Sequence, residues 1–387
     1  MRNNFFRFYQ GIMQSSNLIM KKIFLLGLVS VIINLSGIKL FAQIPKLNNA
    51  FYFSSGIVVD SKGNAFVTGG NHKVIKITPT GKAELFAGGG RNDKDGQGKN
   101  AGFNNTNGIA IDGEDNLYVT DNTKIRKITP DGMVSTIAGV TNAGSSDGDR
   151  TTASFFQAGK IAIDNKGNIY VTDNAPGKVS NSGDHLIRKI TAQGIVTTLQ
   201  NGNAGALILP DMRALACDME GNLYVCANAS NCIKKITQAG VITTIAGQCD
   251  KKFNSYYKEG SIATAVLSDP NGIAIAKNGD IYFSDASLNR IFKIAGNMVK
   301  TIAGGGKMSF NGNPYGVTEP GEKDGKALQA TFDNPAGISF DKTGNLYIVD
   351  GSGRNNSYIR MLSQDGIVST FCKHIWNPKT QQYEEAD

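Results

Sequence analysis

Runs of four to six residues, rich in β-branched and aromatic side chains, recur along the chain and are separated by Gly, Asn and Asp. Such runs predict short β-strands, and the residues between them predict tight turns. The first two runs, residues 56–60 and 63–67, form a pattern that returns five more times. The six copies begin near residues 56, 108, 160, 213, 272 and 337. A third and a fourth run follow each pair, so the repeated unit is predicted to be four short strands.

Repetition of this kind determines the fold, because a four-stranded sheet with apolar residues on both faces is not stable alone. Packing six such sheets face to face around an axis covers both faces of each. The 345 residues from 43 to 387, divided by six, give about 57 per unit, which suits one propeller blade. The sequence therefore predicts an all-β protein, a six-bladed β-propeller of four-stranded antiparallel blades that forms a single domain over residues 43–387.

The turn after the first strand carries an Asp, two polar residues, and then Gly and Asn, as in Asp60 to Asn64. The carboxylate is expected to accept backbone N–H bonds, while Gly or Asn takes a positive φ. The repeated Asp and Gly are therefore interpreted as turn residues.

Three motifs resemble the NHL-repeat family of propellers: Gly-Ile-Ala-Ile-Asp at 108–112, Gly-Asn-Leu-Tyr-Val at 221–225, and Ile-Arg-Lys-Ile at 125–128. The resemblance covers roughly residues 50–372. It implies the six-bladed architecture and says little about activity, because the family includes protein-binding, RNA-binding and enzymatic members.

A second repeated element lies between blades, where an acid-Gly pair is followed by Ala-x-Phe or Ala-x-Leu. It begins at Asp95, Asp147, Glu259 and Asp324 with constant spacing. We expect a short helical turn that begins at the acid-Gly pair and wedges Ala and Phe between adjacent blades.

These connections emerge on one face together with the loops between second and third strands. We call it the long-loop face, and the opposite face, with the Asp-x-x-Gly-Asn turns, the turn face. Long, dissimilar loops are where binding sites usually lie. The long-loop face is therefore the predicted binding surface, for an unknown protein, glycan or small molecule.

Matching positions after the second strand place polar residues on the long-loop face. They are Asp121, Asp173, Asn228, Asp285 and Asp350. A ring of carboxylates is able to hold a ligand or a divalent cation such as calcium; the alternative interpretation is that each caps its own loop. No cofactor is otherwise predicted.

His72 and His185 precede third strands, where family members often carry Asn-His or Asp-His, so they are expected to close loops and are secondary candidates for ligand binding. The resemblance also raises a zinc-dependent lyase, since amidating lyases of this type bind metal through histidines. The third histidine, His374, lies in the tail, which argues against a three-histidine zinc site. Neither His72 nor His185 lies in a recognisable triad setting, and no diagnostic lactonase motif is present.

Lysines occupy matching positions in five third strands: Lys76, Lys127, Lys189, Lys235 and Lys293, with Met361 in the sixth. Polyanion binding is one interpretation. The other is structural, with buried stems whose amines reach the rim or a neighbouring acid. Among the five cysteines, Cys226 and Cys232 flank one hairpin loop and are predicted to form a disulfide across it.

The net charge of +8 depends on the first 42 residues, which hold five basic residues and no acid. The remaining 35 basic and 32 acidic residues give +3, too little for a nucleic-acid footprint, so no nucleic-acid partner is predicted. Residues 20–42 show the pattern of a secretory signal, with Lys21 and Lys22 before an apolar run and Ala42 before the expected start at Gln43. Residues 1–19 are interpreted as an upstream extension, and no later segment resembles a membrane span.

The sequence thus predicts a secreted or periplasmic propeller that binds a ligand or protein through its long-loop face. The alternative is a metal-dependent lyase or lactonase on the same scaffold.

Overall fold

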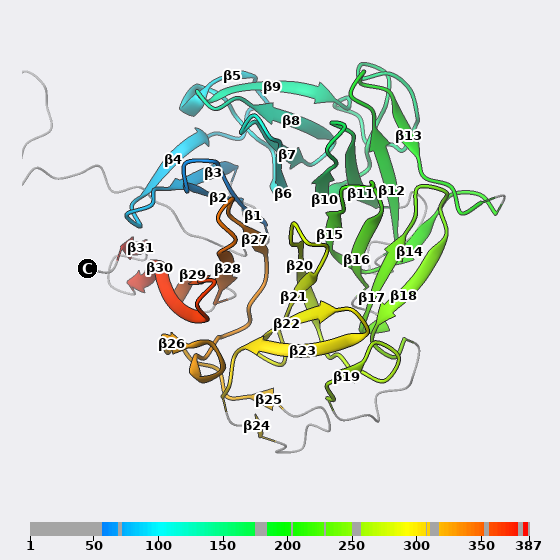
Figure 1. The fold of residues 1–387 in the computed structure, drawn as a ribbon. Helices are drawn as coiled ribbons and strands as arrows, with labels where there is room; N and C mark the ends of the chain where they lie inside the picture. The colour runs from blue at the N-terminus through cyan, green and yellow to red at the C-terminus, as the bar shows by residue number, and fades with distance from the viewer. Residues whose placement is uncertain are drawn as a thin grey trace, which may run out of the picture. The chain divides into compact units, whose positions relative to one another are not determined.

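A computed structural model describes residues 56–68, 72–174, 184–202, 204–227, 230–249, 257–306, 308–309, 317–351, 356–377 and 382–385. All of them belong to the unit Asn49–Asp387. No α-helix occurs in these ranges. They form a six-bladed β-propeller whose blades follow one another around a ring from blue to red in Figure 1.

Each blade contains four antiparallel strands in sequence order, with the first strand innermost. Blade one is β1 (Gly56–Val59), β2 (Ala65–Thr68), β3 (Lys73–Ile77) and β4 (Ala83–Gly88). Blade two is β6 (Thr106–Ile111), β7 (Leu117–Asp121), β8 (Lys124–Ile128) and β9 (Met133–Ala138). Blade three is β10 (Ala158–Ile163), β11 (Ile169–Asn174), β12 (Asp184–Ile190) and β13 (Val196–Thr198).

Blade four is β15 (Met212–Cys217), β16 (Leu223–Ala227), β17 (Cys232–Ile236) and β18 (Ile242–Ala246). Blade five is β20 (Pro270–Ile275), β21 (Ile281–Asp285), β22 (Arg290–Ala295) and β23 (Met298–Ala303). Blade six is β27 (Ile338–Phe340), β28 (Leu346–Asp350), β29 (Asn356–Leu362) and β30 (Ile367–Asn377). The first strands of the blades begin at Gly56, Thr106, Ala158, Met212, Pro270 and Ile338.

Short strands add to these blades. β5 (Gly96–Gln97), β19 (Gly260–Ser261) and β26 (Gly325–Lys326) each pair with the outer strand of a blade, β14 (Ile208–Pro210) pairs with β12, and β31 (Gln382–Glu385) pairs with β30. β24 (Met308–Ser309) and β25 (Val317–Thr318) pair with each other. Two 3₁₀ turns follow β5 and β26: η1 (Gly98–Asn100) and η3 (Ala327–Gln329).

The connection between blades is more elaborate than the helical turn expected. The Gly of its acid-Gly pair and the residue after it first form an edge strand on the outer strand of the following blade, as Gly96 does opposite Val134. The 3₁₀ turn comes next, and then Ala101 and Phe103 lie buried between blades one and two. The predicted wedge is therefore confirmed, and the acid-Gly pair additionally covers an exposed sheet edge.

The hydrophobic core consists of six clusters, each made by residues of two consecutive blades. One of them joins blade six to blade one, with Tyr347, Val349 and Ile359 packing against Ile57 and Val67. In the described residues the ring therefore closes by apolar packing between these two blades.

The turn chemistry is also confirmed. Asp60 Oδ1 accepts N–H bonds from Lys62 at 2.9 Å and from Asn64 at 2.8 Å, and its Oδ2 accepts one from the Asn64 side chain at 2.7 Å. Gly63 has a φ of 82°, a conformation that suits glycine. No helix of membrane-spanning length and hydrophobicity occurs among the described residues.

Candidate functional site

The aspartates that follow the second strands are fully buried and hold the incoming inter-blade connections. Asp121 Oδ1 accepts N–H bonds from Asn104 at 2.7 Å and Asn105 at 2.9 Å. Asp173 Oδ1 accepts bonds from Phe156 and Gln157, both at 2.9 Å. Among the described residues, these two carboxylates therefore bond the connection that enters their blade, and not the loop that follows their own strand.

Three arginines that the sequence analysis did not single out neutralise these aspartates. Arg126, Arg188 and Arg360 occupy the same register position in the third strands, and each is 0% exposed. They contact Asp121 at 2.7 Å, Asp173 at 3.1 Å and Asp350 at 3.0 Å. The sequence feature that could have identified them is the second residue of Ile-Arg-Lys-Ile, because an arginine within an apolar strand needs a buried partner.

The same arginines reach the acid of the acid-Gly pair and the backbone of the connection. Arg188 Nη2 donates to Asp147 at 3.1 Å and to the Ser146 carbonyl at 2.9 Å, while Nη1 donates to the Ser154 carbonyl at 2.9 Å. Its guanidinium also lies over the Phe155 ring, 5.1 Å from the centroid. Equivalent contacts join Arg126 to Asp95 and Phe103, and Arg360 to Asp324 and Phe332. One buried cation therefore ties each of these connections to its blade.

Blade five departs from this pattern. Phe292 occupies the register position of the arginines, opposite Phe283. Asp285 is 0% exposed and accepts N–H bonds from Ser268, Asp269 and Leu288 at 2.9, 3.0 and 3.1 Å. Burial raises the pKa of Asp285 to about 6, although these three hydrogen bonds favour the charged carboxylate and lower the pKa.

Burial also raises the pKa of Asp173 to about 6 and that of Asp350 to about 7, although an arginine contacts each of them. Asn228 lies outside the described residues. Because the described members of this set face protein groups, a ligand has no open access to their carboxylates. Ligand binding at these positions stays a prediction.

The two candidate histidines lie in different blades. His72 precedes β3, and its Nε2 accepts a hydrogen bond from Arg91 at 2.6 Å. His185 lies in β12, opposite Asn174 and Leu209. In the ranges that the structure describes, no group of three His, Cys, Asp or Glu side chains is placed to hold a metal ion.

The lysines of the third strands have structural contacts, as the second interpretation expected. Their amines lie over tyrosine rings of the neighbouring strand in four blades, at 5.3 to 5.7 Å from the ring centroid: Lys127 over Tyr118, Lys189 over Tyr170, Lys235 over Tyr224 and Lys293 over Tyr282. Lys76 lies 3.7 Å from Glu84.

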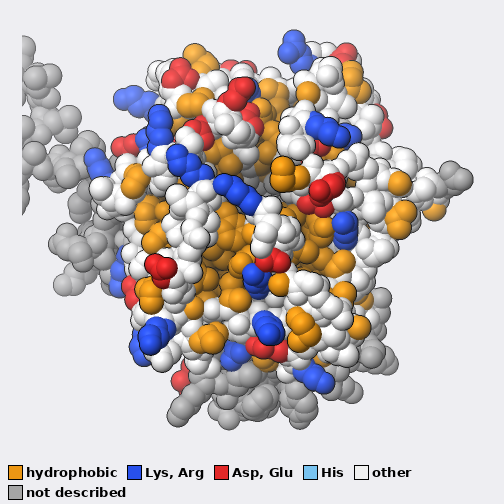
Figure 2. Space-filling model, in the orientation of Figure 1, with side chains coloured by type: hydrophobic (Ala, Val, Ile, Leu, Met, Phe, Trp, Pro, Cys, Tyr) orange, Lys and Arg blue, Asp and Glu red, His pale blue; other side chains and the backbone are white. Residues whose placement is uncertain are grey.

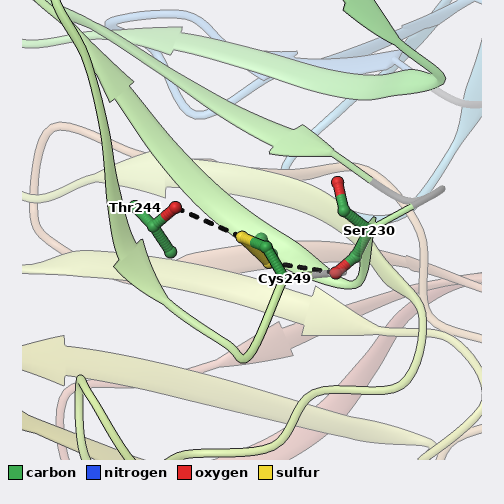
Figure 3. The surroundings of a disulfide bond; sticks show 4 residues. Ser230, Thr244 and Cys249 are labelled. Atoms are coloured by element: carbon green, nitrogen blue, oxygen red, sulfur yellow. Dashed lines mark hydrogen bonds between the residues drawn. A yellow bond between two sulfur atoms is a disulfide. The ribbon is translucent and has the colours of Figure 1, made fainter. Parts of the chain in front are cut away.

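The predicted disulfide between Cys226 and Cys232 is wrong. Cys232 instead pairs with Cys249, whose sulfur also accepts a hydrogen bond from Thr244 at 3.2 Å (Figure 3). Cys226 is fully buried, and its thiol is directed to the Gly272 carbonyl at 3.8 Å. The sequence reasoning considered one hairpin, whereas the bond links β17 to the loop after β18.

A large cavity, of about 940 Å³, opens on the turn face. Its lining includes Val59, Ile111, Ile275 and Phe340 near the ends of first strands, and the turns of blades one, two, five and six surround it. Figure 2 shows apolar side chains gathered toward the middle of the face drawn, with charged side chains around them.

One departure from the sequence repeat, which the sequence analysis did not use, lies at this cavity. In blades two, three and four, a tyrosine hydroxyl donates to the turn Asp, as Tyr118 does to Asp112 at 3.0 Å. Blade five has Ala276 in place of that Asp, and both Ala276 and Tyr282 line the cavity.

A smaller cavity, of about 60 Å³, lies where the first strands of all six blades begin, which is on the long-loop face. Its lining includes Lys160 and Arg213 among glycines and aliphatic residues.

Comparisons with known proteins agree with the repeat architecture. A family model for the Teneurin NHL domain matches residues 313–382. Teneurin-4 of Homo sapiens is 31% identical over 230 residues, which are 57% of this chain and 8% of that protein. Protein SUPPRESSOR OF QUENCHING 1, chloroplastic, of Arabidopsis thaliana is 25% identical over 342 residues, 80% of this chain and 30% of that protein. The chain thus spans less than a third of either relative's length.

A solved structure of a protein of unknown function from Bacteroides thetaiotaomicron VPI-5482 superposes with a TM-score of 0.57 at 18% identity, covering 82% of this chain and 68% of that one. At this identity the likeness concerns the fold alone.

Proposed function

Because this chain is an NHL-repeat six-bladed propeller, we propose that it is a binding module that takes a protein partner on its long-loop face. The observation that carries the proposal is the set of buried Asp–Arg pairs beneath that face. They fix the described connections before blades two, three and six from below, so that these connections are ordered before any partner arrives.

Preorganisation of this kind favours binding, because loops that are already ordered lose less conformational entropy in a complex. In blade three, Asp173 holds the backbone N–H groups of Phe156 and Gln157, and Arg188 holds the carbonyls of Ser146 and Ser154. Both ends of the exposed stretch between these residues are therefore anchored.

The shape and chemistry of the long-loop face suit a protein partner. The ring side chain of Phe156, on the connection between β9 and β10, is 42% exposed. Exposed aromatic side chains on a rigid support are typical anchors of protein interfaces. Small molecules instead require concave pockets of a few hundred Å³, and the axial cavity on this face holds only about 60 Å³.

Photo-crosslinking tests the proposal. A photoreactive phenylalanine analogue replaces Phe156 on the long-loop face or, as the matched control, Met219 on the turn face, which is 66% exposed. In cells that produce the protein, we expect a covalent protein adduct of defined mass from position 156 and none from position 219. Adducts from position 219 alone, or none from position 156, would refute the proposal.

The proposal includes export. The pattern of residues 20–42 supports it, and so does the Cys232–Cys249 disulfide, because such bonds persist in oxidising compartments. Mass spectrometry of the exported protein is expected to show Gln43 at its N-terminus; a retained segment 20–42 would contradict this.

The cavity on the turn face favours a second candidate function, the binding of a small amphipathic molecule. Its volume of about 940 Å³ lies at the upper end of the usual range for ligand sites. An NMR screen with neutral aromatic and sugar-like compounds tests this, with shifts expected at Ala276 and Tyr282. A screen in which no compound shifts either residue would reject this candidate.

A further inference from the structure

One position in the innermost strands is equivalent in all six blades and lines the axial cavity. The residues there are Gly56, Gly108, Lys160, Ala214, Gly272 and Gly337. Four of the six are glycine, and one is a lysine. The lysine is thus an exception within the repeat.

Close packing around the axis explains the glycines. A Cβ on Gly108 would lie 2.5 Å from the Gly159 carbonyl oxygen, and one on Gly272 would lie 2.1 Å from the Ala336 carbonyl oxygen. The fold therefore requires a minimal side chain at these two positions. Packing does not explain a long charged side chain at the third.

No carboxylate pairs with Lys160 among the described residues. Its ammonium donates to the Asn107 side-chain oxygen at 3.2 Å, and the residue is half-buried. Arg213 lines the same cavity and is paired through Nε with Asp211 at 2.9 Å. Two cations and one carboxylate leave this part of the molecule with an excess positive charge.

From this geometry we propose that the axial cavity on the long-loop face is an anion site, in which Lys160 and Arg213 bind one carboxylate or phosphate group. An anion placed between an ammonium and a guanidinium accepts charge-assisted hydrogen bonds from both. The cavity of about 60 Å³ has the volume of about two water molecules, enough for one such group.

The titration of Lys160 agrees with this assignment. Burial and the neighbouring Arg213 lower the pKa of Lys160 to about 8. An anion in the cavity favours the charged form of the ammonium and would therefore raise this pKa. The pKa of Lys160 should therefore be higher when an anion occupies the cavity than when the cavity is empty.

The occupant follows from the proposed function, on which this part of the inference rests: an acidic side chain of the protein partner inserts into the cavity. A free phosphate shares the same chemistry. Binding of a small anion can be measured without any partner, so the two proposals can fail separately.

The test is NMR of the full chain with labelled lysine side chains, titrated with acetate as a carboxylate probe and with inorganic phosphate. We expect the Lys160 resonance to shift with at least one probe, and the pKa of Lys160 to rise by about one unit at saturation. Lys160→Gly, which restores the residue of four other blades, and Lys160→Met should weaken binding at least tenfold. Lys189→Met, a lysine over the Tyr170 ring, serves as the control and should change affinity less than twofold.

A response to acetate indicates a carboxylate site, and a response to phosphate alone indicates a phosphate site. If neither anion shifts Lys160, or if Lys160→Gly binds as tightly as the unchanged protein, the anion site does not exist. A third outcome is that the anion binds, but Lys160→Met does not reduce crosslinking of the protein partner to the photoreactive residue at position 156. The anion site then stands, and only its assignment to the partner's acidic side chain is wrong.

Discussion

Replacing Arg188 by Met tests whether the buried Asp–Arg pairs hold the long-loop connections in place. The substitution keeps a long apolar side chain against Phe155 but removes the charge. It leaves Asp173, which is 0% exposed, with two backbone N–H bonds and no cation in contact. It also leaves the Ser146 and Ser154 carbonyls without their arginine donors.

The expected loss in the free energy of unfolding is about 3 to 5 kcal/mol at pH 8, the usual result of breaking a buried pair by removing one partner. The loss should depend on pH. Burial already raises the pKa of Asp173 to about 6, and without Arg188 it should rise further. Because the folded state then holds a proton that the unfolded state releases, stability falls as pH rises through the folded-state pKa. A rise of the folded-state pKa from about 6 to about 7 widens the difference in stability between pH 6 and pH 8 by about 1 kcal/mol, and that difference reaches at most about 2.7 kcal/mol.

Chemical denaturation followed by circular dichroism at pH 6 and pH 8 measures both effects. Lys76→Met is the matched control, because Lys76 and Glu84 form a surface pair at 3.7 Å with 25% and 43% exposed side chains. Surface pairs of this kind contribute about 0 to 1 kcal/mol. Adding Asp173→Asn to Arg188→Met should recover part of the loss. A loss below about 1 kcal/mol at pH 8, or a loss that is larger at pH 6, would refute this reasoning.

Three further changes test other parts of the structure. Cys249→Ser should lower the free energy of unfolding by about 3 kcal/mol in oxidising buffer, because the Cys232–Cys249 bond closes a loop with a sequence separation of 17, and should have little effect under reducing conditions; equal effects in both buffers would contradict this. Ala276→Asp combined with Asp280→Asn restores the turn of the other blades and should stabilise the protein by about 1 kcal/mol through new turn hydrogen bonds, measured by thermal unfolding, whereas a destabilised variant would argue against it. Cutting the chain near residue 205 should give two insoluble halves, because each blade is covered only by its neighbours, and a soluble, monomeric and folded half would disprove the single ring.

The architecture was predictable because it depends on local patterns. Strand runs, Asp-x-x-Gly-Asn turns and the Ala-x-Phe wedge each repeat at fixed spacing, and six repeats suffice to identify the propeller. Each of these features depends on the properties of a few consecutive residues, so it can be recognised in the sequence alone.

The site was less predictable because its contacts join distant segments. Arg188 meets Asp173 from the adjacent strand and Asp147 from the connection, 41 residues earlier. Only the folded blade brings the three together. Sequence reasoning placed Asp173 correctly at the end of its strand but left open whether it faced a ligand or the protein.

The cysteines and the axial lysine show the same limit. Cys232 lies nearer to Cys226 in sequence, yet the fold brings Cys249 to it with a Cα–Cα distance of 5.6 Å. In the sequence, Lys160 is one of many departures from the repeat, at a position where Gly108 and Gly272 stand in other copies. Its meaning emerged only when the equivalent glycines proved to line a closely packed axis.

The measurement that tests the central claim most directly is the affinity of the crosslinked partner for two single variants. Phe156→Ser changes the long-loop face, and Met219→Ser changes the turn face, both at exposed apolar positions. If the long-loop face is the binding surface, Phe156→Ser should weaken binding at least tenfold, and Met219→Ser should change it less than twofold. Equal affinities for the Phe156→Ser variant and the unchanged protein, with a large loss for Met219→Ser, would contradict the account.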